Sequence, residues 1–169
     1  VNNILEIEKL QSGTPVLLER NNIDLVDLTE LVVESIMGSA KDHLINLTLE
    51  IKDAPLMISA DKIKIQRVLQ NLISNAIKYS PEKGDVVVTT YLDDEYAMVS
   101  IQDTGYGIPA HELPHIFDRY SRVKGHKHLA VGTGLGLAIV QSLVEAHGGR
   151  VTVTSVENEG STFILQLPF

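Results

Sequence analysis

The sequence contains no cysteine, no long hydrophobic run and no excess of basic residues. Without cysteine the chain has no disulfide, no thiolate nucleophile and no cysteine zinc site, and this absence agrees with a reducing compartment. No apolar run approaches the roughly eighteen residues that span a bilayer, so we expect no membrane crossing. The 14 Lys and Arg residues are outnumbered by 22 Asp and Glu residues, and the formal charge of -8 argues against a nucleic-acid surface.

The remaining composition is that of an ordinary globular domain. The 169 residues are 44% hydrophobic and 21% charged, and they contain no internal repeat or low-complexity segment. A chain of this length buries about two-thirds of the surface that it exposes when unfolded. The first residue is Val1 rather than Met, and no signal peptide is visible in the sequence. We therefore expect one domain that is a piece of a longer protein.

Apolar periodicity and turn residues predict the order of the elements. Residues 1–12 read as the tail of a helix that Gly13 and Pro15 end. Strands are expected near 16–23, 47–51, 56–59, 86–91, 96–102, 150–155 and 161–167, and helices at about 24–43, 61–79 and 134–147. The strands fall mostly in antiparallel hairpins with helices between them. This order favours an α+β fold with two layers over a doubly wound parallel sheet.

The first complete helix has two candidate caps, Asp24 and Asp27. Its period predicts a buried face made of Leu28, Leu31, Val32, Ser35 and Ile36.

The helix at 61–79 carries two distinct faces. Its apolar residues recur at intervals of three and four and predict a buried stripe of Ile65, Val68, Leu69, Leu72, Ile73, Ala76 and Ile77. Asn71, Asn75 and Lys78 share another face. A solvated face is the ordinary explanation, but asparagine has poor helix propensity and here occurs twice in mid-helix. An amide oxygen suits Mg2+ that takes its negative charge from phosphates, and Lys78 would reach those phosphates as a point charge.

A first glycine box, Asp103-Thr-Gly-Tyr-Gly107, follows an alternating strand. A carboxylate only accepts hydrogen bonds, so Asp103 suits the amino group of adenine and opposes the carbonyl of guanine. Gly105 and Gly107 permit positive φ and close approach of the backbone to a flat ring. An Asp-Gly turn between strands is the alternative, since this pattern arises by chance in roughly one chain in twenty.

A second glycine box, Gly132-Thr133-Gly134-Leu135-Gly136, enters a helix, whose first N–H groups bind phosphate well. It matches neither the Walker loop nor the dinucleotide fingerprint, and the protein-kinase motifs are missing. A flexible loop before a helix is the alternative. Between the boxes, the basic residues suit a lid over a polyphosphate: Arg119, Arg122, Lys124 and Lys127.

Histidines supply a competing motif. His111-Glu-Leu-Pro-His115 matches the zinc-protease pattern, but Pro114 breaks the continuous helix that the pattern requires. His43 and His147 fall near helix C-termini, where a cation is mildly favoured.

Taken in this order, the motifs resemble the ATP-binding catalytic domain of sensor histidine kinases, in the superfamily of gyrase B, MutL and a heat-shock chaperone. The resemblance runs from about Leu17 to Phe169. The matching segments are 71–81 (the N box), 103–108 (the first glycine box), 116–120 (the F box), 132–137 (the second glycine box) and 160–163 (the final strand pair).

The resemblance implies the Bergerat fold, a two-layer α/β sandwich in which helices pack on one face of a mixed, mostly antiparallel sheet. It implies ATP and Mg2+ as cofactors, with Asp103 on adenine, Asn75 on the metal, Tyr79 beside the nucleoside and Thr162 behind the adenine. The implied nucleotide-binding residues are Asn71, Asn75, Lys78, Tyr79, Asp103, Gly105, Gly107, Ile108, Tyr120, Gly132, Thr133, Gly134, Leu135, Gly136, Leu137 and Thr162. The candidate catalytic residues are Asn71, Lys78, Arg119 and Arg122.

Two departures from the family pattern affect function. Many relatives carry an aromatic residue at Ser121, which leaves Tyr120 as the nearby aromatic of the lid. ATPases of the superfamily usually have Glu where this chain has Asn71. An amide takes no proton, which disfavours ATP hydrolysis or activation of a serine, whereas a histidine nucleophile needs little help.

The acceptor histidine that the family uses lies on a separate helical hairpin, and its motif is absent here. Residues 1–13 resemble the last turns of that hairpin, and residues 14–169 the ATP-binding domain. The resemblance implies partners in the chain's own dimerisation and histidine-phosphotransfer domain and in a response regulator. It also implies a cytoplasmic location, a monomeric fragment and a homodimeric full-length protein. A degenerate nucleotide-sensing module and an ATPase of the gyrase and MutL type are the alternatives.

Overall fold

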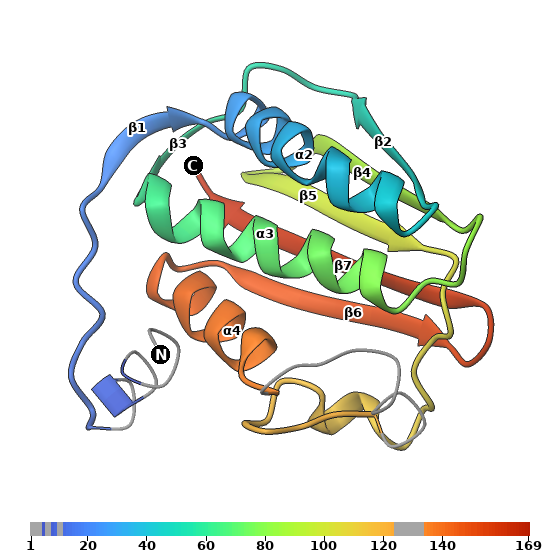
Figure 1. The fold of residues 1–169 in the computed structure, drawn as a ribbon. Helices are drawn as coiled ribbons and strands as arrows, with labels where there is room; N and C mark the ends of the chain where they lie inside the picture. Colours follow the sequence, from blue (N-terminus) through green and yellow to red (C-terminus); the bar gives the residue numbers. More distant parts are fainter. Residues whose placement is uncertain (1–4, 6–7, 10–11, 124–133) are drawn as a thin grey trace.

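A five-stranded sheet with three helices on one face forms the body of the protein (Figure 1). The computed structural model describes residues 5, 8–9, 12–123 and 134–169. The sheet runs in the order β2 (Asn46–Ile51), β4 (Asp85–Asp93), β5 (Tyr96–Asp103), β7 (Gly160–Pro168), β6 (Arg150–Val156). The helices are α2 (Leu25–Asp42), α3 (Lys62–Lys78) and α4 (Gly136–Ala146). The predicted two-layer α/β sandwich is confirmed.

The sheet is mixed because one of its pairings is parallel. β2 runs parallel to β4, and the other three neighbouring pairs are antiparallel. A separate two-stranded antiparallel sheet joins β1 (Asn21–Asp24) to β3 (Met57–Ala60). The strand predicted at 16–23 is wrong over residues 16–20, because pairing begins only at Asn21. Just before it, the N–H of Glu19 donates to Oδ2 of Asp61 (3.0 Å) instead of to a neighbouring strand.

Helix α2 begins at a cap that also fixes its rotation. Asp24 accepts from the N–H of Val26 (2.9 Å) and from the N–H of Leu56 (3.0 Å), so Asp24 rather than Asp27 is the cap. Because these bonds draw the first turn against the chain before β3, the buried face starts at Leu25. It comprises Leu25, Val26, Leu28, Thr29, Val32, Val33 and Ala40. The predicted inward positions Leu31 and Ser35 are exposed instead.

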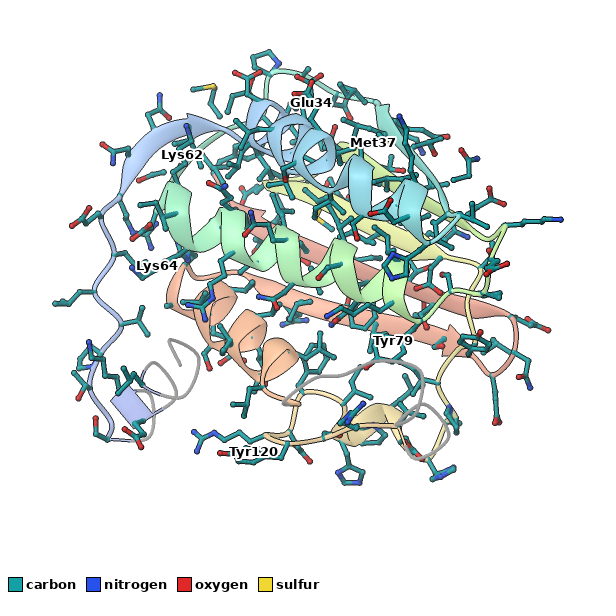
Figure 2. All side chains as sticks on the ribbon, viewed as in Figure 1. Glu34, Met37, Lys62, Lys64, Tyr79 and Tyr120 are labelled. Carbon is teal, nitrogen blue, oxygen red and sulfur yellow. The ribbon has the colours of Figure 1, made fainter. Side chains whose placement is uncertain are left out.

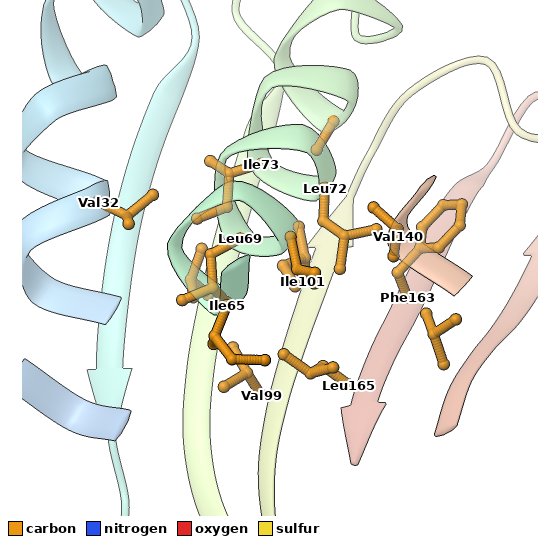
Figure 3. Close-up of a cluster of buried hydrophobic side chains, with 14 of the residues drawn as sticks. Val32, Ile65, Leu69, Leu72, Ile73, Val99, Ile101, Val140, Phe163 and Leu165 are labelled. Carbon is orange, nitrogen blue, oxygen red and sulfur yellow. The ribbon is translucent and has the colours of Figure 1, made fainter. Parts of the chain in front are cut away.

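Helix α3 lies between α2 and α4 and carries the centre of the core (Figures 1 and 3). Asp61 caps it, and its buried residues are the seven that the sequence period predicts. In Figure 3 this stripe faces Val32 of α2, Val140 of α4, and Val99 and Ile101 of β5. The stripe therefore fixes which face of α3 remains for polar side chains.

The N-terminal end of α3 meets the C-terminal end of α4 through a buried histidine. The N–H of Asp61 donates to Nε2 of His147 (3.1 Å), and Nδ1 of His147 lies 2.6 Å from the carbonyl of Leu143. Because Nε2 accepts, the ring proton is on Nδ1 and the imidazole is neutral. Burial lowers the pKa of His147, which is 3% exposed. The expected preference for a cation at this position is wrong.

Within the described residues, no helix combines the length and the apolar character that crossing a bilayer requires.

Candidate functional site

A cavity opens where the C-terminal end of α3 meets the end of β5, the start of β7 and the start of α4. Its lining residues come from all five of the matching segments: the N box, the first glycine box, the F box, the second glycine box and the final strand pair. They are Asn75, Ala76, Tyr79, Asp103, Gly107, Ile108, Ile116, Leu137, Ser161 and Phe163. Six of these were predicted from the sequence, namely Asn75, Tyr79, Asp103, Gly107, Ile108 and Leu137.

Asp103 supplies a buried carboxylate to this cavity. It ends β5, is 8% exposed, and accepts from the N–H groups of Gly105 (2.9 Å) and Ser161 (3.2 Å). Both bonds go to Oδ1, and among the described residues no donor contacts Oδ2. Burial raises the pKa of Asp103, and the two backbone bonds offset this only in part. The carboxyl group thus offers one unpaired acceptor oxygen to a ligand that carries an N–H donor.

The glycines beside Asp103 are required by the protein's own backbone. Gly107 has a φ of +67°, and a Cβ there would lie 2.9 Å from Cα of Glu157 in the turn between β6 and β7. Gly105 has no positive φ, but its Cβ would collide with the carbonyl of Tyr79 and lie 2.8 Å from Oδ1 of Asp103. These contacts fix the loop that carries Gly107 into the lining of the cavity.

The polar face of α3 divides between the cavity and the start of α4. Asn75 lines the cavity. Asn71 does not line it, since its Nδ2 donates to the carbonyl of Arg67 (3.0 Å) and its Oδ1 faces Gly136. Lys78 is exposed. The predicted trio therefore shares a face, but only Asn75 reaches this cavity.

Strand β7 contributes Ser161 to the cavity in place of Thr162. The strand alternates, with Ser161, Phe163 and the later odd-numbered residues buried towards the helices. Thr162 pairs with Gln102 and Thr154 and belongs to the opposite face of the sheet. Oγ of Ser161 hydrogen-bonds to Oγ of Ser155 (2.8 Å). The sequence could have identified Ser161, because residues two apart in a strand share one face and Ser161 lies two residues before the buried Phe163.

The segment after the first glycine box closes one wall of the cavity. Ile116 lines it, and the ring of Phe117 packs edge-on against Phe163, with centroids 6.4 Å apart and planes at 81°. Both follow η1, a short 3-10 helix (Leu113–His115). Ile116 and Phe163 were not predicted as site residues, although both belong to the matching segments.

The zinc interpretation fails on local structure. Pro114 lies at the start of η1, so no continuous helix joins His111 to His115. His111 lies beside Glu112 (3.6 Å), and His115 lies beside Asp118 (3.1 Å). Over 12–123 and 134–169, no three His, Cys, Asp or Glu side chains gather as a metal would require.

The start of α4 meets the end of the F-box segment. Gly134 has a φ of +73°, and a Cβ there would lie 2.7 Å from Cα of Tyr120. Tyr120 has a φ of +59° and is 65% exposed at the edge of the molecule, well away from Tyr79 in Figure 2. Leu135 is 1% exposed and belongs to the core, whereas Leu137 lines the cavity.

The basic residues of the expected lid are described only in part. Arg119 is exposed and Arg122 is half-buried with a partner. Lys124, Lys127, Gly132 and Thr133 lie outside the described residues.

The cavity combines the buried acceptor of Asp103, the amide of Asn75 and apolar walls. Ile108, Ile116, Leu137 and Phe163 provide the walls. This combination suits a flat heterocycle with an exocyclic amino group. The family comparison agrees, since residues 60–169 match the model of the histidine kinase-, DNA gyrase B- and HSP90-like ATPases.

The chain belongs to this family. Within it, the chain is a sensor histidine kinase ATP-binding domain by similarity. It is 36% identical over 172 residues to sensor histidine kinase WalK of Bacillus subtilis (strain 168), a match that covers 100% of the chain and 28% of WalK.

Two solved histidine kinases share the fold of this family member. Full-length ShkA in complex with AMPPNP is 29% identical and superposes with a TM-score of 0.87, over 99% of this chain and 35% of ShkA. ThkA in complex with the response regulator protein TrrA is 26% identical, with a TM-score of 0.77 over 98% of this chain and 47% of ThkA.

Proposed function

We propose that this chain is the catalytic domain of a sensor histidine kinase that binds Mg-ATP and donates the γ-phosphoryl group to a histidine of a separate dimerisation domain. The observation that carries the proposal is Asp103. Its Oδ1 is held by two backbone donors, while Oδ2 has no donor among the described residues. An adenine amino group would supply that donor. A buried charge-assisted bond of this kind contributes about 1.5–3 kcal/mol.

The cavity supports this ligand along its length. The apolar side chains would hold the adenine ring, and Ser161 rather than Thr162 lies beside Asp103. The amide oxygen of Asn75 is a hard neutral ligand suited to Mg2+. Because no carboxylate cluster accompanies it in the described residues, such a cation would take its charge balance from the phosphates. The same phosphates would be contacted by Lys78, Gly132, Thr133 and the start of α4.

Phosphoryl transfer would rest on positioning and charge neutralisation. Asn71 stands where a general base would be expected, and an amide takes no proton. A neutral imidazole nucleophile needs little activation, so a histidine acceptor fits this site better than water or serine. Bound Mg2+ would supply charge neutralisation on the phosphates, and Lys78, Arg119 and Arg122 would add positive charge.

The proposed partners lie outside this chain. The chain spans 28% of WalK, so the acceptor hairpin, whose last turns residues 1–13 resemble, would be supplied by the rest of the protein. ThkA was crystallised with the response regulator TrrA, and a response regulator is the proposed downstream partner here. We propose a monomer for the isolated chain and a homodimer for the full protein.

The test mixes this chain with a separately produced hairpin bearing the acceptor histidine. Calorimetry should detect Mg-ATP binding, and acid-labile phosphate should appear on the hairpin only when the chain, Mg2+ and ATP are all present. Binding without transfer would instead support a nucleotide-sensing module. Phosphate release without the hairpin would support an ATPase, and absence of binding would contradict the proposal as a whole.

A further inference from the structure

Gly136, the first residue of α4, is a glycine for a reason that its own backbone does not explain. Unlike Gly107 and Gly134, it has no positive φ. Glycine destabilises a helix relative to alanine, so its presence here needs another cause. A Cβ on Gly136 would lie 3.0 Å from Oδ1 of Asn71 and 3.8 Å from its Cγ. Apart from its own helix and chain neighbours, no other described atom lies within 4 Å.

Asn71 is oriented by a bond within α3. Its Nδ2 donates to the carbonyl of Arg67, four residues earlier, at 3.0 Å. A carbonyl only accepts, so this bond fixes which end of the amide is nitrogen. The oxygen is therefore the end that faces Gly136.

The start of α4 lacks a polar cap of its own. Leu135 occupies the N-cap position, is 1% exposed, and makes no side-chain cap bond. The first N–H groups of a helix have no partner within the helix and carry partial positive charge. The Asn71 oxygen, the negative end of an amide dipole, lies against this turn because Gly136 leaves room for it.

We propose that Asn71 is a positioning residue that holds the first turn of α4 against α3, and that Gly136 is its matched partner. This inference rests on the proposed function. In that function, the N–H groups at the start of α4 serve the phosphates, while Asn75, one turn along from Asn71, serves the metal. Asn71 thus sets the distance between the start of α4, which serves the phosphates, and the part of α3 that carries Asn75, without entering the cavity itself.

The decisive measurement is a double-mutant cycle with Asn71→Ala and Gly136→Ala. Each single change should weaken Mg-ATP binding about three- to tenfold, the first by releasing α4 and the second by adding a Cβ against the amide. In the Gly136→Ala background, Asn71→Ala should cost nothing or restore affinity, because it removes the group that the new Cβ meets. Residues in contact couple by about 0.5–3 kcal/mol, which is twofold to more than a hundredfold.

Adenosine separates positioning from a general loss of structure. Adenosine has no phosphates, so Asn71→Ala should leave its binding within about twofold. Gln70→Ala, at an exposed neighbour on α3, is the matched control and should change neither ligand. Multiplicative losses in the cycle, or equal losses for ATP and adenosine, would overturn the inference.

Hydrogen exchange on the nucleotide-free protein keeps the test independent of the proposed function. Asn71→Ala should speed exchange of the amides in the first turns of α4, whereas Gln70→Ala should not. If the wild-type protein binds no Mg-ATP but the exchange result holds, the proposed function fails while the contact between Asn71 and Gly136 stands. Unchanged exchange would contradict that contact directly.

Discussion

Two buried carboxylates lie near opposite ends of α3 and differ in how many hydrogen-bond donors and cations surround them. Asp61 caps the N-terminal end and is 4% exposed; Asp103 lies near the C-terminal end and is 8% exposed. Lys64 and Tyr79, labelled in Figure 2, mark these two ends. Asp61 accepts from the N–H groups of Glu19 (3.0 Å) and Lys64 (3.2 Å) and from Nζ of Lys64 (3.1 Å). Asp103 has two backbone donors on one oxygen and, within the described part of the chain, no cation beside it.

The pKa shifts follow from this difference. Burial acts to raise the pKa of Asp61, but the hydrogen bonds of Glu19 and Lys64 and the charge of Lys64 outweigh it, and the pKa is lowered. Burial prevails at Asp103, whose pKa is raised. A carboxylate saturated with donors stabilises the fold, whereas one left short of donors is costly until a ligand completes it.

The largest expected effect comes from breaking the backbone fit behind Asp103 with Gly107→Ala. Alanine at this position would have to adopt the left-handed backbone conformation, and its Cβ would lie against the backbone of Glu157. Together these should cost about 3 kcal/mol in the free energy of unfolding, measured by chemical denaturation. Gly148→Ala is the matched control, since it has a similar φ (+77°) but its nearest atom is 3.7 Å away, and it should cost only about 1 kcal/mol. Equal costs would show that crowding at Gly107 is unimportant.

Asp103→Asn should weaken ATP binding and raise the stability of the nucleotide-free protein. Loss of the charged acceptor should weaken ATP binding roughly ten- to hundredfold by calorimetry. Because the folded pKa lies above the unfolded value, the buried charge costs stability at neutral pH, so the nucleotide-free variant should melt higher than the wild type. Unchanged affinity would refute the assignment of Asp103 to adenine.

The same carboxylate should make ATP binding sensitive to acid. The wild-type affinity should fall as the pH drops towards the raised pKa of Asp103, above the ordinary value of 3.8, because the protonated group no longer accepts through both oxygens. In Asp103→Asn this part of the pH dependence should disappear. Asp93, which is exposed at the end of β4, provides a control, since Asp93→Asn should leave the wild-type profile intact.

Asp61→Asn should have the reverse pattern. With a lowered folded pKa, Asp61 contributes stability above its unfolded pKa, and this is lost as pH falls through the folded value. At pH 7 the substitution should cost about 1–2 kcal/mol of unfolding free energy, from the cap and the Lys64 bond. ATP affinity measured well below the melting temperature should stay within about twofold. A larger loss of affinity would mean that the two ends of α3 are not independent.

His147 should give the smallest effect, at mildly acidic pH. Its folded pKa is lowered, so its contribution is present above the unfolded value of about 6.5 and declines as pH falls below it. One proton limits the slope to about 1.4 kcal/mol per pH unit. His147→Gln should flatten the decline, while His43→Gln, at an exposed histidine, should not. Equal slopes in both variants would contradict this origin.

Periodicity predicted those parts of the molecule in which local pattern and burial agree. The apolar stripe of α3 was predicted completely, because a helix buried along its length keeps its period of 3.6. The hairpin β4–β5 was also predicted, because local pattern and burial agree there too. Asn75 and Asp103 reach the cavity because each lies on an element whose orientation the pattern fixes.

Two of the misses depend on contacts between distant segments. Leu31 proved exposed because Asp24 also binds the N–H of Leu56, 32 residues away, and this bond sets the rotation of α2. The role of Gly136 depends on Asn71 across two helices, which no local window contains. Ser161 differs, since strand alternation could have identified it before any contact was known.

The two ends of α3 have different roles, and the bond from Glu19 to Asp61 belongs to the first of these ends. The segment that leads into the domain is fastened to the first turn of this helix, and the amide that would hold the metal stands near the last. A helix of 17 residues is about 25 Å long. The attachment of the entering chain and the cavity residue Asn75 therefore lie towards opposite ends of α3, which is why we expect loss of the Asp61 cap to leave ATP affinity nearly unchanged.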